Sequence, residues 1–341
     1  MVVRCQCVSE MMKDSHGETV TLPLKEARVL EKVGQVKIIG DREGMSLSVF
    51  PKEMKEDGYL KRVEFDGRGT LTRVAWIQDY RKNGGAELSN FLVVKIGHQC
   101  GFDIIGVTPE NSNMDLIRKA NVIIVNNCHE FVDSQFQRLL AAIYESGKPV
   151  VKYEHDHREI QRKNIGDRMF RQSKLNVFIS PLQMKNHVDA FPGIEDHSIC
   201  LPLAVDPESF LLSTSGKPGS VLVPSYNKGR SEMSKFIIDN PQYEYVVIGN
   251  SEFTSMGNVS SKFEMSYIEI IREYGKHEFV LHKPDKVGGG ERVYFEALLS
   301  GCKLLTNDNV AHVSWGFDEP TARKELRIAP YTFWRRISDL V

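Results

Sequence analysis

The sequence predicts an α/β protein in which two Rossmann-like domains face a cleft and a small β-rich module precedes them. From Arg73 onward, apolar strands alternate with Gly-containing turns and amphipathic helices, and this alternation stops near residue 201 and starts again at residue 220. Such an alternation is typical of βαβ units that build a parallel sheet. Before residue 41 the pattern differs, because polar and apolar residues alternate over short stretches.

Residues 1–70 form the predicted β-rich accessory module and its connector. The stretch GETVTLPLKEARVLEKVGQVKII (17–39) predicts short strands, a helix at Lys25–Lys32 and a further strand after Gly34. Residues 41–70 are charged, contain glycine and lack a long period, which favours a connecting segment with one or two strands.

The first Rossmann-like domain is expected at residues 71–204. We predict its strands at RVAWIQDY (73–80), FDIIGVT (102–108), NVIIVNN (121–127), PVVKYEH (149–155) and NVFIS (176–180). Leu88, Phe91, Leu92 and Lys95 lie on one intervening helix. A second helix has a core-facing stripe at helical spacing, made of Phe136, Leu139, Leu140 and Ile143.

The Pro-rich stretch LPLAVDPESF (201–210) ends this unit, and residues 205–218 form the expected linker to a second domain at 219–341. We predict strands of the second domain at SVLVPS (220–225), YEYVVIG (243–249), HEFVLHKP (277–284) and KLLTND (303–308). Because ligands of open α/β sheets bind outside the carboxyl ends of the strands, the two domains are expected to share one site.

Composition excludes few functions. The formal net charge is −1, which gives no global electrostatic reason to bind nucleic acid, although a local basic patch is compatible with it. There is no run of about 18 apolar residues, and MVVRCQCVSEMMKD lacks the features of a signal peptide. The six cysteines form no C-x-x-C pair, and Cys5-x-Cys7 has no second ligand pair at a suitable spacing. We therefore expect a cytoplasmic protein with reduced thiols and no membrane span.

Two Gly-containing junctions between a strand and a helix suggest ligand contacts. In DYRKNGGAELSN, Gly84 and Gly85 precede a helix that begins near Glu87; a plain tight turn is the more common meaning of such a pair. In SYNKGRSEMSKF (225–236), Lys228 and Arg230 flank Gly229, which suits a diphosphate because cations add charge-assisted hydrogen bonds. A solvated charged turn is the alternative there.

The stretch KVGGGERVYFEALLSGCKLLTND (286–308) combines three glycines with a helix. Gly288, Gly289 and Gly290 allow a tight loop, and a helix from about Glu291 would direct its N–H groups toward negative charge. Arg292 and Glu296 are neighbours at i, i+4. The alternative is a helix with one surface ion pair, worth under about 1 kcal/mol.

The segment YEHDHRE offers polar groups at the end of a predicted strand. His155, Asp156 and His157 could suggest a metal site, but on a strand the two histidines would share a face with no further ligand in view. We therefore favour a polar cluster that contacts a ligand over a metal site. His129 in NNCHEF is a candidate for the same wall, with a capping or solvent-exposed role as the alternative.

Together these stretches resemble the large retaining glycosyltransferase family of the B fold, often called glycosyl transferases group 1, over roughly residues 72–341. The resemblance depends on the order and spacing of GGAE (84–87), GKPVVKYEHDH (147–157), LPLAVDPESF (201–210), KG (228–229) and ERVYFEALLSGCKLLTN (291–307). KPVVKYEHDHR, FEALLSGCKLLTND and a downstream SWG are most similar to the branch found in tailed bacteriophages. Residues 1–40 are similar to small accessory modules of tailed-phage proteins.

The resemblance assigns roles to residues by position. It implies that Lys228 contacts the donor diphosphate, that Glu296 accepts from the ribose, and that the loop 288–291 lies beside the donor sugar. The remaining implied donor contacts are Gly84, Gly85, Gly229, Arg230, Gly289, Gly290, Glu291 and Arg292. The implied catalytic residues are His155, Asp156, Lys228 and Arg292, with His129 and His157 on the acceptor side.

Two positions depart from the family pattern. A glutamate usually stands eight residues before Glu296, where this chain has Gly288, so Glu291 would substitute or the contact would be lost. An arginine usually stands five residues before Lys228, where this chain has Val223, so Arg230 or Arg292 would have to supply that charge.

The resemblance implies transfer of a sugar, with retained stereochemistry, from a UDP- or GDP-linked donor to an acceptor hydroxyl, without a cofactor. The similarity to phage proteins suggests a hydroxymethylated pyrimidine in DNA as acceptor, with action in the host cytoplasm. KYEHDHREIQRKNIGDRMFRQSK (152–174) holds seven Lys or Arg against four acids, enough for a modest phosphate-binding face. Glycan, lipid and protein acceptors are alternatives. So are an epimerase or phosphorylase on the same architecture, and a catalytically silent nucleotide-sugar or nucleic-acid binding protein.

Overall fold

The structure is a computed structural model that describes residues 2–7, 19–23, 36–38, 72–79, 85–161, 163–212, 216–249, 256–263, 265–288 and 291–341. The chain divides into two compact units, Met1–Gly58 and Tyr59–Val341. The division falls within the segment 41–70, which the sequence indicates as a connector.

In the first unit the structure describes three strands, β1 (Val2–Cys7), β2 (Thr19–Pro23) and β3 (Val36–Ile38). They form an antiparallel sheet in the order β2-β1-β3, with Cys5 opposite both Val20 and Ile38. This arrangement agrees with the short alternating stretches of the sequence. The helix expected at Lys25–Lys32 lies outside the described residues.

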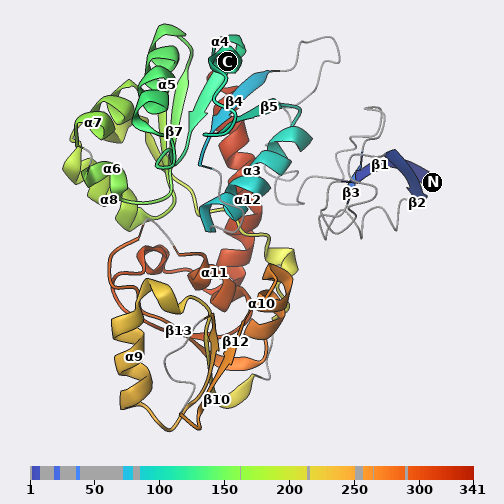
Figure 1. The fold of residues 1–341 in the computed structure, drawn as a ribbon, viewed down its shortest axis with the longest axis vertical. Helices are drawn as coiled ribbons and strands as arrows, with labels where there is room; N and C mark the ends of the chain where they lie inside the picture. The colour runs from blue at the N-terminus through green and yellow to red at the C-terminus, as the bar shows by residue number, and fades with distance from the viewer. Residues whose placement is uncertain are drawn as a thin grey trace. The chain divides into compact units, whose positions relative to one another are not determined.

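The second unit begins with a six-stranded parallel sheet in the order β5-β4-β6-β7-β8-β9 (Figure 1). We call this sheet, together with the helices that pack on it, the first half. Its strands are β4 (Arg73–Ile77), β5 (Asp103–Val107), β6 (Val122–Val125), β7 (Val150–Glu154), β8 (Leu175–Phe178) and β9 (Ser198–Cys200). The central strands β6, β7 and β8 are buried throughout, as expected for a parallel sheet covered on both faces.

The helices of the first half are α3 (Gly85–Gln99), α4 (Met114–Lys119), α5 (Asp133–Glu145), α6 (Arg158–Gln161), α7 (Lys163–Gln172) and α8 (Pro181–Ala190). The predicted stripe on α5 packs into the core, with Phe136, Leu139 and Ile143 buried and Leu140 partly buried. On α3 the buried side is made of other residues, namely Ser89, Asn90, Val93, Ile96 and Gly97, and Phe91 is 68% exposed.

A second parallel sheet has the strand order β12-β11-β10-β13-β14. We call this sheet, together with its helices, the second half. Its strands are β10 (Lys217–Val223), β11 (Glu244–Ile248), β12 (Val259–Lys262), β13 (His277–His282) and β14 (Lys303–Thr306). Its helices are α9 (Arg230–Asp239), α10 (Tyr267–Tyr274) and α11 (Arg292–Leu299). Apolar clusters cover both faces of this sheet, one around Val223 and Met233 and the other around Leu222 and Ala297.

Every predicted strand of both halves is present. Each strand ends one to three residues earlier than the sequence indicates, because strand pairing stops before the last residues of the predicted segment, such as Gln78 and Asp79 after β4. β10 starts at Lys217, inside the expected linker. β9 and β12 were not predicted, since SIC is short and VSSK is mostly polar.

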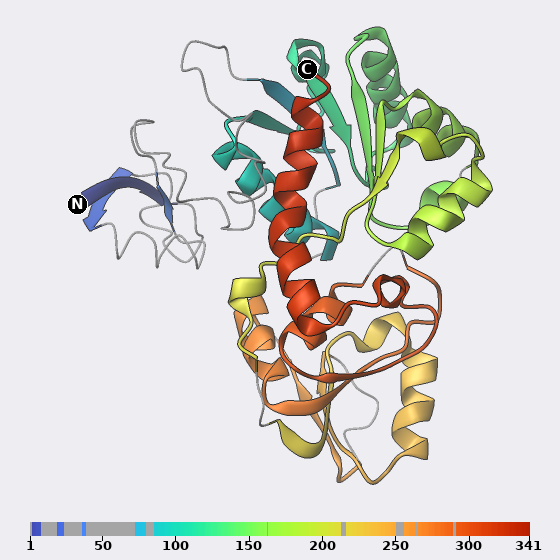
Figure 2. The same ribbon diagram turned by 180° about the vertical axis from the view of Figure 1, so that it is seen from behind.

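The last helix, α12 (Glu319–Ser338), runs from the second half along the first half, as both ribbon views show (Figures 1 and 2). Trp334 donates from Nε1 to the backbone oxygen of Val93 at 2.7 Å and packs against Phe102. A Cβ at Gly97 would lie 2.3 Å from Trp334, so glycine allows this close packing. The short 3₁₀ segment η8 (Ala311–Trp315) also joins the halves, through Trp315 Nε1 to Ile179 O. The C-terminal residues therefore hold the two halves together.

Candidate active site

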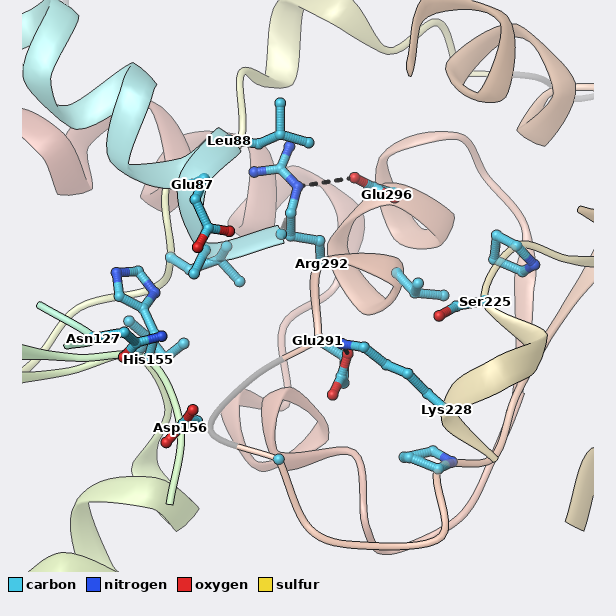
Figure 3. A pocket seen from close by; sticks show the side chains of 18 of the residues that line it. Glu87, Leu88, Asn127, His155, Asp156, Ser225, Lys228, Glu291, Arg292 and Glu296 are labelled. Carbon is cyan, nitrogen blue, oxygen red and sulfur yellow. Dashed lines mark hydrogen bonds and ion pairs between the residues drawn. The ribbon is translucent and has the colours of Figure 1, made fainter. Parts of the chain in front are cut away.

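A cleft of about 840 Å³ is lined by both halves at the carboxyl ends of their strands. From the first half it is lined by residues that follow β4, β6 and β7, together with the first turn of α3; from the second half by residues that follow β10 and β13, together with α10 and α11. Figure 3 shows Glu87, Asn127, His155 and Asp156 on one side of this cleft, and Lys228, Glu291 and Arg292 on the other.

Lys228 and Glu291 form the ionic centre of the second-half wall. Lys228 ends the 3₁₀ turn η7 (Tyr226–Lys228) after β10, and its Nζ lies 2.7 Å from Glu291 Oε2. Glu291 occupies the N-cap position of α11 without a side-chain capping bond and is nearly buried, while the Lys228 side chain is 57% exposed. Burial opposes ionisation of Glu291, but the His282 ring, whose Nε2 lies 3.7 Å from Glu291 Oε2, and the charge of Lys228 outweigh it and lower its pKa to about 2. Glu291 is therefore a carboxylate at neutral pH.

At this wall, Gly229 and Gly288 allow neighbouring groups to approach the backbone more closely than a side chain would permit. A Cβ at Gly229 would lie 1.8 Å from the backbone oxygen of Lys283, so any side chain there would displace the loop after β13. A Cβ at Gly288 would lie 2.6 Å from Glu291 Oε1. The Glu291 carboxylate therefore occupies the space where a side chain at position 288, the usual glutamate position, would begin.

Arg292 connects the two halves. It donates from Nη1 to Ser89 Oγ of α3 at 2.8 Å and to the backbone oxygen of Ala204 at 2.9 Å. Within the second half it donates from Nη2 to Tyr267 Oη at 2.6 Å and from Nε to Glu296 Oε1 at 3.1 Å. The predicted i, i+4 pair is thus present, but it is buried, with side chains 10% and 6% exposed, rather than on the surface. Burial opposes the charge of Arg292, yet Glu296 and Tyr267 raise its pKa above the ordinary value of an arginine.

The Glu296 carboxylate accepts hydrogen bonds from three side chains. Its Oε1 accepts from Tyr267 Oη as well as from Arg292, and its Oε2 accepts from Tyr274 Oη at 2.8 Å. Burial and the neighbouring Glu296 charge raise the pKa of both tyrosines, so they remain hydroxyl donors. Since a carboxylate offers about four lone-pair sites, one site on Oε2 is left for a ligand hydroxyl.

The first-half wall is built around Asp79, which follows β4. Its carboxylate accepts from the backbone N–H groups of His129 and Glu130 at 2.9 and 2.8 Å. Asp79 is 4% exposed and lines the cleft. This carboxylate fixes the loop after β6 and places the His129 ring, whose Nε2 lies 3.7 Å from Asp156 Oδ2.

A second carboxylate, Glu154 at the end of β7, organises the next loop. Its Oε1 accepts from the backbone N–H groups of His155 and Asp156, at 3.1 and 3.0 Å. Its Oε2 lies 3.0 Å from Lys152 Nζ, and both side chains are almost completely buried. The turn that carries His155 and Asp156 is therefore fixed from beneath by a buried ion pair.

His155 and His157 diverge, which corrects the expectation that they share one strand face. β7 ends at Glu154, and His155 donates from Nε2 to Asn90 Oδ1 of α3 at 2.9 Å. The His157 ring instead contacts Asn186 of α8 at 3.1 Å. Burial lowers the pKa of His155 to about 3 and also lowers that of His157, against the charge of Asp156, so both rings are neutral at pH 7. Among the described residues no group of three or more His, Cys, Asp or Glu could hold a metal ion.

The structure brings most of the predicted site residues to one cleft. Those that line it are Gly85, His129, His155, Asp156, His157, Lys228, Gly288, Glu291, Arg292 and Glu296. Gly229 and Arg230 lie at the start of α9 and are not among its lining residues. Gly84, Gly289 and Gly290 lie outside the described residues.

Several lining residues were missed from the sequence. Asp79 and Asn127 each follow a strand on the ligand side of the sheet, a position that could have identified them. Tyr267 and Tyr274 lie on α10, which gave no motif. Ser89 of α3, which is not among the lining residues but accepts from Arg292, is 203 residues away from it in sequence, so no local signal connects the two.

The two sheets and the shared cleft define the glycosyltransferase B fold, which this chain has. No protein-family model matches the chain, and no curated protein matches it in sequence. HepE of Anabaena, solved in complex with UDP and glucose, is similar in structure with a TM-score of 0.53 and 13% identity, over 79% of this chain and 98% of that chain.

Two further structures are less similar to this chain, with TM-scores below 0.5. A glycosyltransferase from Rickettsia africae has a TM-score of 0.46 and 12% identity, over 80% of this chain and 95% of that chain. UDP-N-acetylglucosamine 2-epimerase from Rickettsia bellii has a TM-score of 0.48 and 8% identity, over 79% and 97%. At such identities the likeness establishes the fold alone. None of the helices in the described part of the chain is long and apolar enough to cross a membrane.

Proposed function

We propose that this chain is a retaining glycosyltransferase that moves a sugar from a UDP- or GDP-linked donor to an acceptor hydroxyl. One observation carries the proposal: a cleft shared by two Rossmann-like halves has a lysine, Lys228, and the N-terminal end of α11 on one wall and a polar wall opposite. The cation and the helix end suit a diphosphate. The cleft volume of about 840 Å³ lies within the usual range for small-molecule sites.

The donor would lie along the second half. Lys228 would contact the diphosphate, and the remaining site on Glu296 Oε2 would accept from a ribose hydroxyl. Glu291 Oε1, beside Gly288, has no hydrogen-bond partner among the described residues and would accept from a hydroxyl of the donor sugar. Glu291 would thus take the place of the glutamate that this chain lacks at position 288.

Arg292 would act as a positioning residue. The guanidinium already donates to Ser89, Ala204, Tyr267 and Glu296, which leaves little capacity for a diphosphate. Its contacts favour a role in fixing the two walls at the distance that transfer requires.

In the proposed reaction the bond between the anomeric carbon and the diphosphate oxygen breaks, and the diphosphate leaves with the electron pair. The acceptor oxygen bonds to the same face of that carbon, and its proton passes to a diphosphate oxygen. Charge grows on the diphosphate in the transition state, where Lys228 and the α11 N–H groups would stabilise it. His155, neutral and held by Asn90, and Asp156 would line the acceptor side.

The experiment is a panel of UDP- and GDP-linked sugars, followed by calorimetry for binding and by release of nucleoside diphosphate for turnover. Binding with release and a product of retained anomeric configuration by NMR supports the proposal. An inverted product contradicts retention. A 2-epimer formed without acceptor indicates the epimerase alternative, and saturable binding without release indicates a silent binding protein.

The hypothesis that hydroxymethylated DNA is the acceptor gains no support from segment 152–174. Lys152 is buried against Glu154, and Arg158 pairs with Asp156. Arg171 pairs with Asp167, and the Arg168 guanidinium lies 3.9 Å from the centre of the Tyr144 ring. These four cations are engaged within the protein, so the count of seven Lys or Arg overstates the charge available to phosphates.

A further inference from the structure

A chain of hydrogen bonds connects the core of the first half to the His155 ring, which lines the cleft. Trp76 Nε1 lies 2.8 Å from Gln78 Oε1, and Asn90 Nδ2 lies 2.9 Å from the same oxygen. Asn90 Oδ1 in turn lies 2.9 Å from His155 Nε2. Trp76 and Asn90 are buried, and Gln78 is half-buried. The chain therefore begins at a buried indole and ends at a ring on the first-half side of the cleft (Figure 3).

The indole N–H of Trp76 fixes the direction of every bond in this chain, because an indole nitrogen is only a donor. The Gln78 atom that faces it must therefore be the amide oxygen. That oxygen can accept from Asn90 only if the Asn90 NH₂ group faces it, which turns Asn90 Oδ1 toward His155. Since a carbonyl oxygen only accepts, the proton of the His155 ring must be on Nε2.

The other ring nitrogen, His155 Nδ1, is left with a lone pair. Burial lowers the pKa of His155 to about 3, so the ring is neutral at pH 7 and carries one proton. Nδ1 has no hydrogen bond with a described residue, and it is not among their fully buried polar atoms that lack a partner. Because His155 lines the cleft, this nitrogen is open to a ligand.

We infer that Gln78 and Asn90 are positioning residues that fix the tautomer of His155, so that its Nδ1 accepts a hydrogen bond from a ligand hydroxyl. A lone pair cannot donate to a phosphate oxygen, so this contact selects a hydroxyl over the diphosphate. A ring with so low a pKa accepts the bond without taking the proton. The inference rests on the proposed function, under which the hydroxyl belongs to the donor sugar or to the acceptor.

The tautomer is tested in the full-length protein by ¹⁵N–¹H correlation spectra of the histidine rings at pH 7. His155→Phe identifies the His155 signals by their loss. We expect an unprotonated Nδ1 and a protonated Nε2 in the wild-type protein, and a protonated Nδ1 would overturn the inference. This measurement needs neither a ligand nor a variant of Gln78.

Substitutions at Gln78 test the positioning role. Gln78→Met removes the oxygen that accepts from Trp76 and Asn90, so the Asn90 amide can rotate, and we expect His155 signals from both tautomers. Loss of the hydroxyl contact should weaken ligand binding about three- to tenfold. Gln78→Glu should keep the wild-type tautomer and most of the affinity, since a carboxylate only accepts.

Gln135→Met is the matched control. Gln135 is also half-buried and hydrogen-bonded to two backbone groups, but it is not among the cleft-lining residues. This variant should keep the wild-type His155 signals and ligand affinity. Thermal melting of all variants checks that they fold.

Two arms distinguish which substrate supplies the hydroxyl. Calorimetric titration compares the tightest-binding sugar of the UDP- and GDP-linked panel with its free nucleoside diphosphate. Initial rates give the KM of methyl β-D-glucopyranoside as a probe acceptor. Weaker binding of the nucleotide sugar by Gln78→Met, with unchanged binding of the free nucleotide, assigns the hydroxyl to the donor sugar. A raised KM alone assigns it to the acceptor.

Four outcomes with the variants would overturn the inference: His155 signals in Gln78→Met that match the wild type, equal losses in Gln78→Met and Gln78→Glu, equal weakening of the free nucleotide and the nucleotide sugar, or no response in either arm. Failure of the proposed function is distinct. It appears as absent binding of every nucleoside diphosphate sugar by the wild-type protein, whereas the ring spectra still report the tautomer.

Discussion

The two walls of the cleft use opposite strategies to order polar groups. On the second half, Lys228 and Glu291 form an ion pair in which the lysine is more than half exposed, next to the N-terminal end of α11. On the first half, buried carboxylates accept backbone N–H groups and place histidine rings, as Asp79 does for His129 and Glu154 for His155. Under the proposed function, the wall of the second half would hold the diphosphate and the wall of the first half would contact hydroxyl groups.

Arg292 bonds to residues of both halves, and its loss should have the largest effect. Arg292→Met leaves Glu296 buried without its cation, which should reduce the free energy of unfolding by about 3–5 kcal/mol. Thermal and denaturant unfolding would measure this, and Arg292→Met with Glu296→Leu should recover part of the loss. Arg171→Met removes an exposed i, i+4 pair and should cost under about 1 kcal/mol. A loss as small as that of the control would contradict the joining role.

Lys228 tests the wall that is proposed to bind the diphosphate. Lys228→Met should lower turnover by about 10²–10³-fold, because charge grows on the leaving diphosphate in the transition state. Steady-state kinetics with saturating donor and acceptor would measure it. Lys235→Met is the control, since Lys235 lies on α9, pairs with Asp239 and is not among the cleft-lining residues. If turnover at saturation is intact while acceptor binding collapses, the roles of the two walls are reversed.

A substitution at Gly229 tests whether the close contact between this residue and the backbone of Lys283 is needed for the structure of the second-half wall. Gly229→Ala would place its Cβ against the backbone oxygen of Lys283, and the displacement should cost about 1–3 kcal/mol of stability and weaken donor binding. Gly257→Ala is the matched control, because a Cβ there meets nothing within 4 Å. Calorimetric titration with the donor would separate the two variants, and equal affinities would show that the loop tolerates the change.

The neutral histidines of the first half predict a pH dependence. His155 and His187 have pKa values lowered to about 3, chiefly by burial, against an ordinary value of 6.5. Between these values the unfolded chain binds protons that the folded chain does not, so stability should fall as pH is lowered from about 6.5 toward 3. His187→Phe should show a smaller fall in melting temperature over this range. Phe191→Leu, in the same aromatic cluster, should parallel the wild type, and a parallel course for both variants would refute the assignment.

The sequence predicted the sheets and much of one wall, because these depend on local patterns. Buried parallel strands appear as apolar runs, and the glycines beside Lys228 and Glu291 mark junctions between strands and helices. The i, i+4 spacing of Arg292 and Glu296 predicted their pair. Its burial, and its bonds to Ser89 and Ala204, depend on chain segments far away in sequence and had no local signal.

The wall of the first half was predicted less completely, because its side chains are positioned by residues that are distant in sequence. His155 and Asp156 were found by their residue types, but their orientation comes from contacts with Glu154 and Asn90 that gave no local signal. α12 was also missed. It contains Pro330, a residue that usually argues against a helix interior, and tertiary packing of Trp334 on α3 outweighs that preference.

Hydrogen–deuterium exchange with saturating UDP, and separately GDP, tests the division of labour between the walls most directly. A diphosphate at the second half should slow exchange in residues 225–236 and 286–299, which carry Lys228, Glu291 and the start of α11, and leave residues 126–131 and 153–158 unchanged. Protection confined to residues 126–131 and 153–158, or no protection by either nucleotide, would contradict the account.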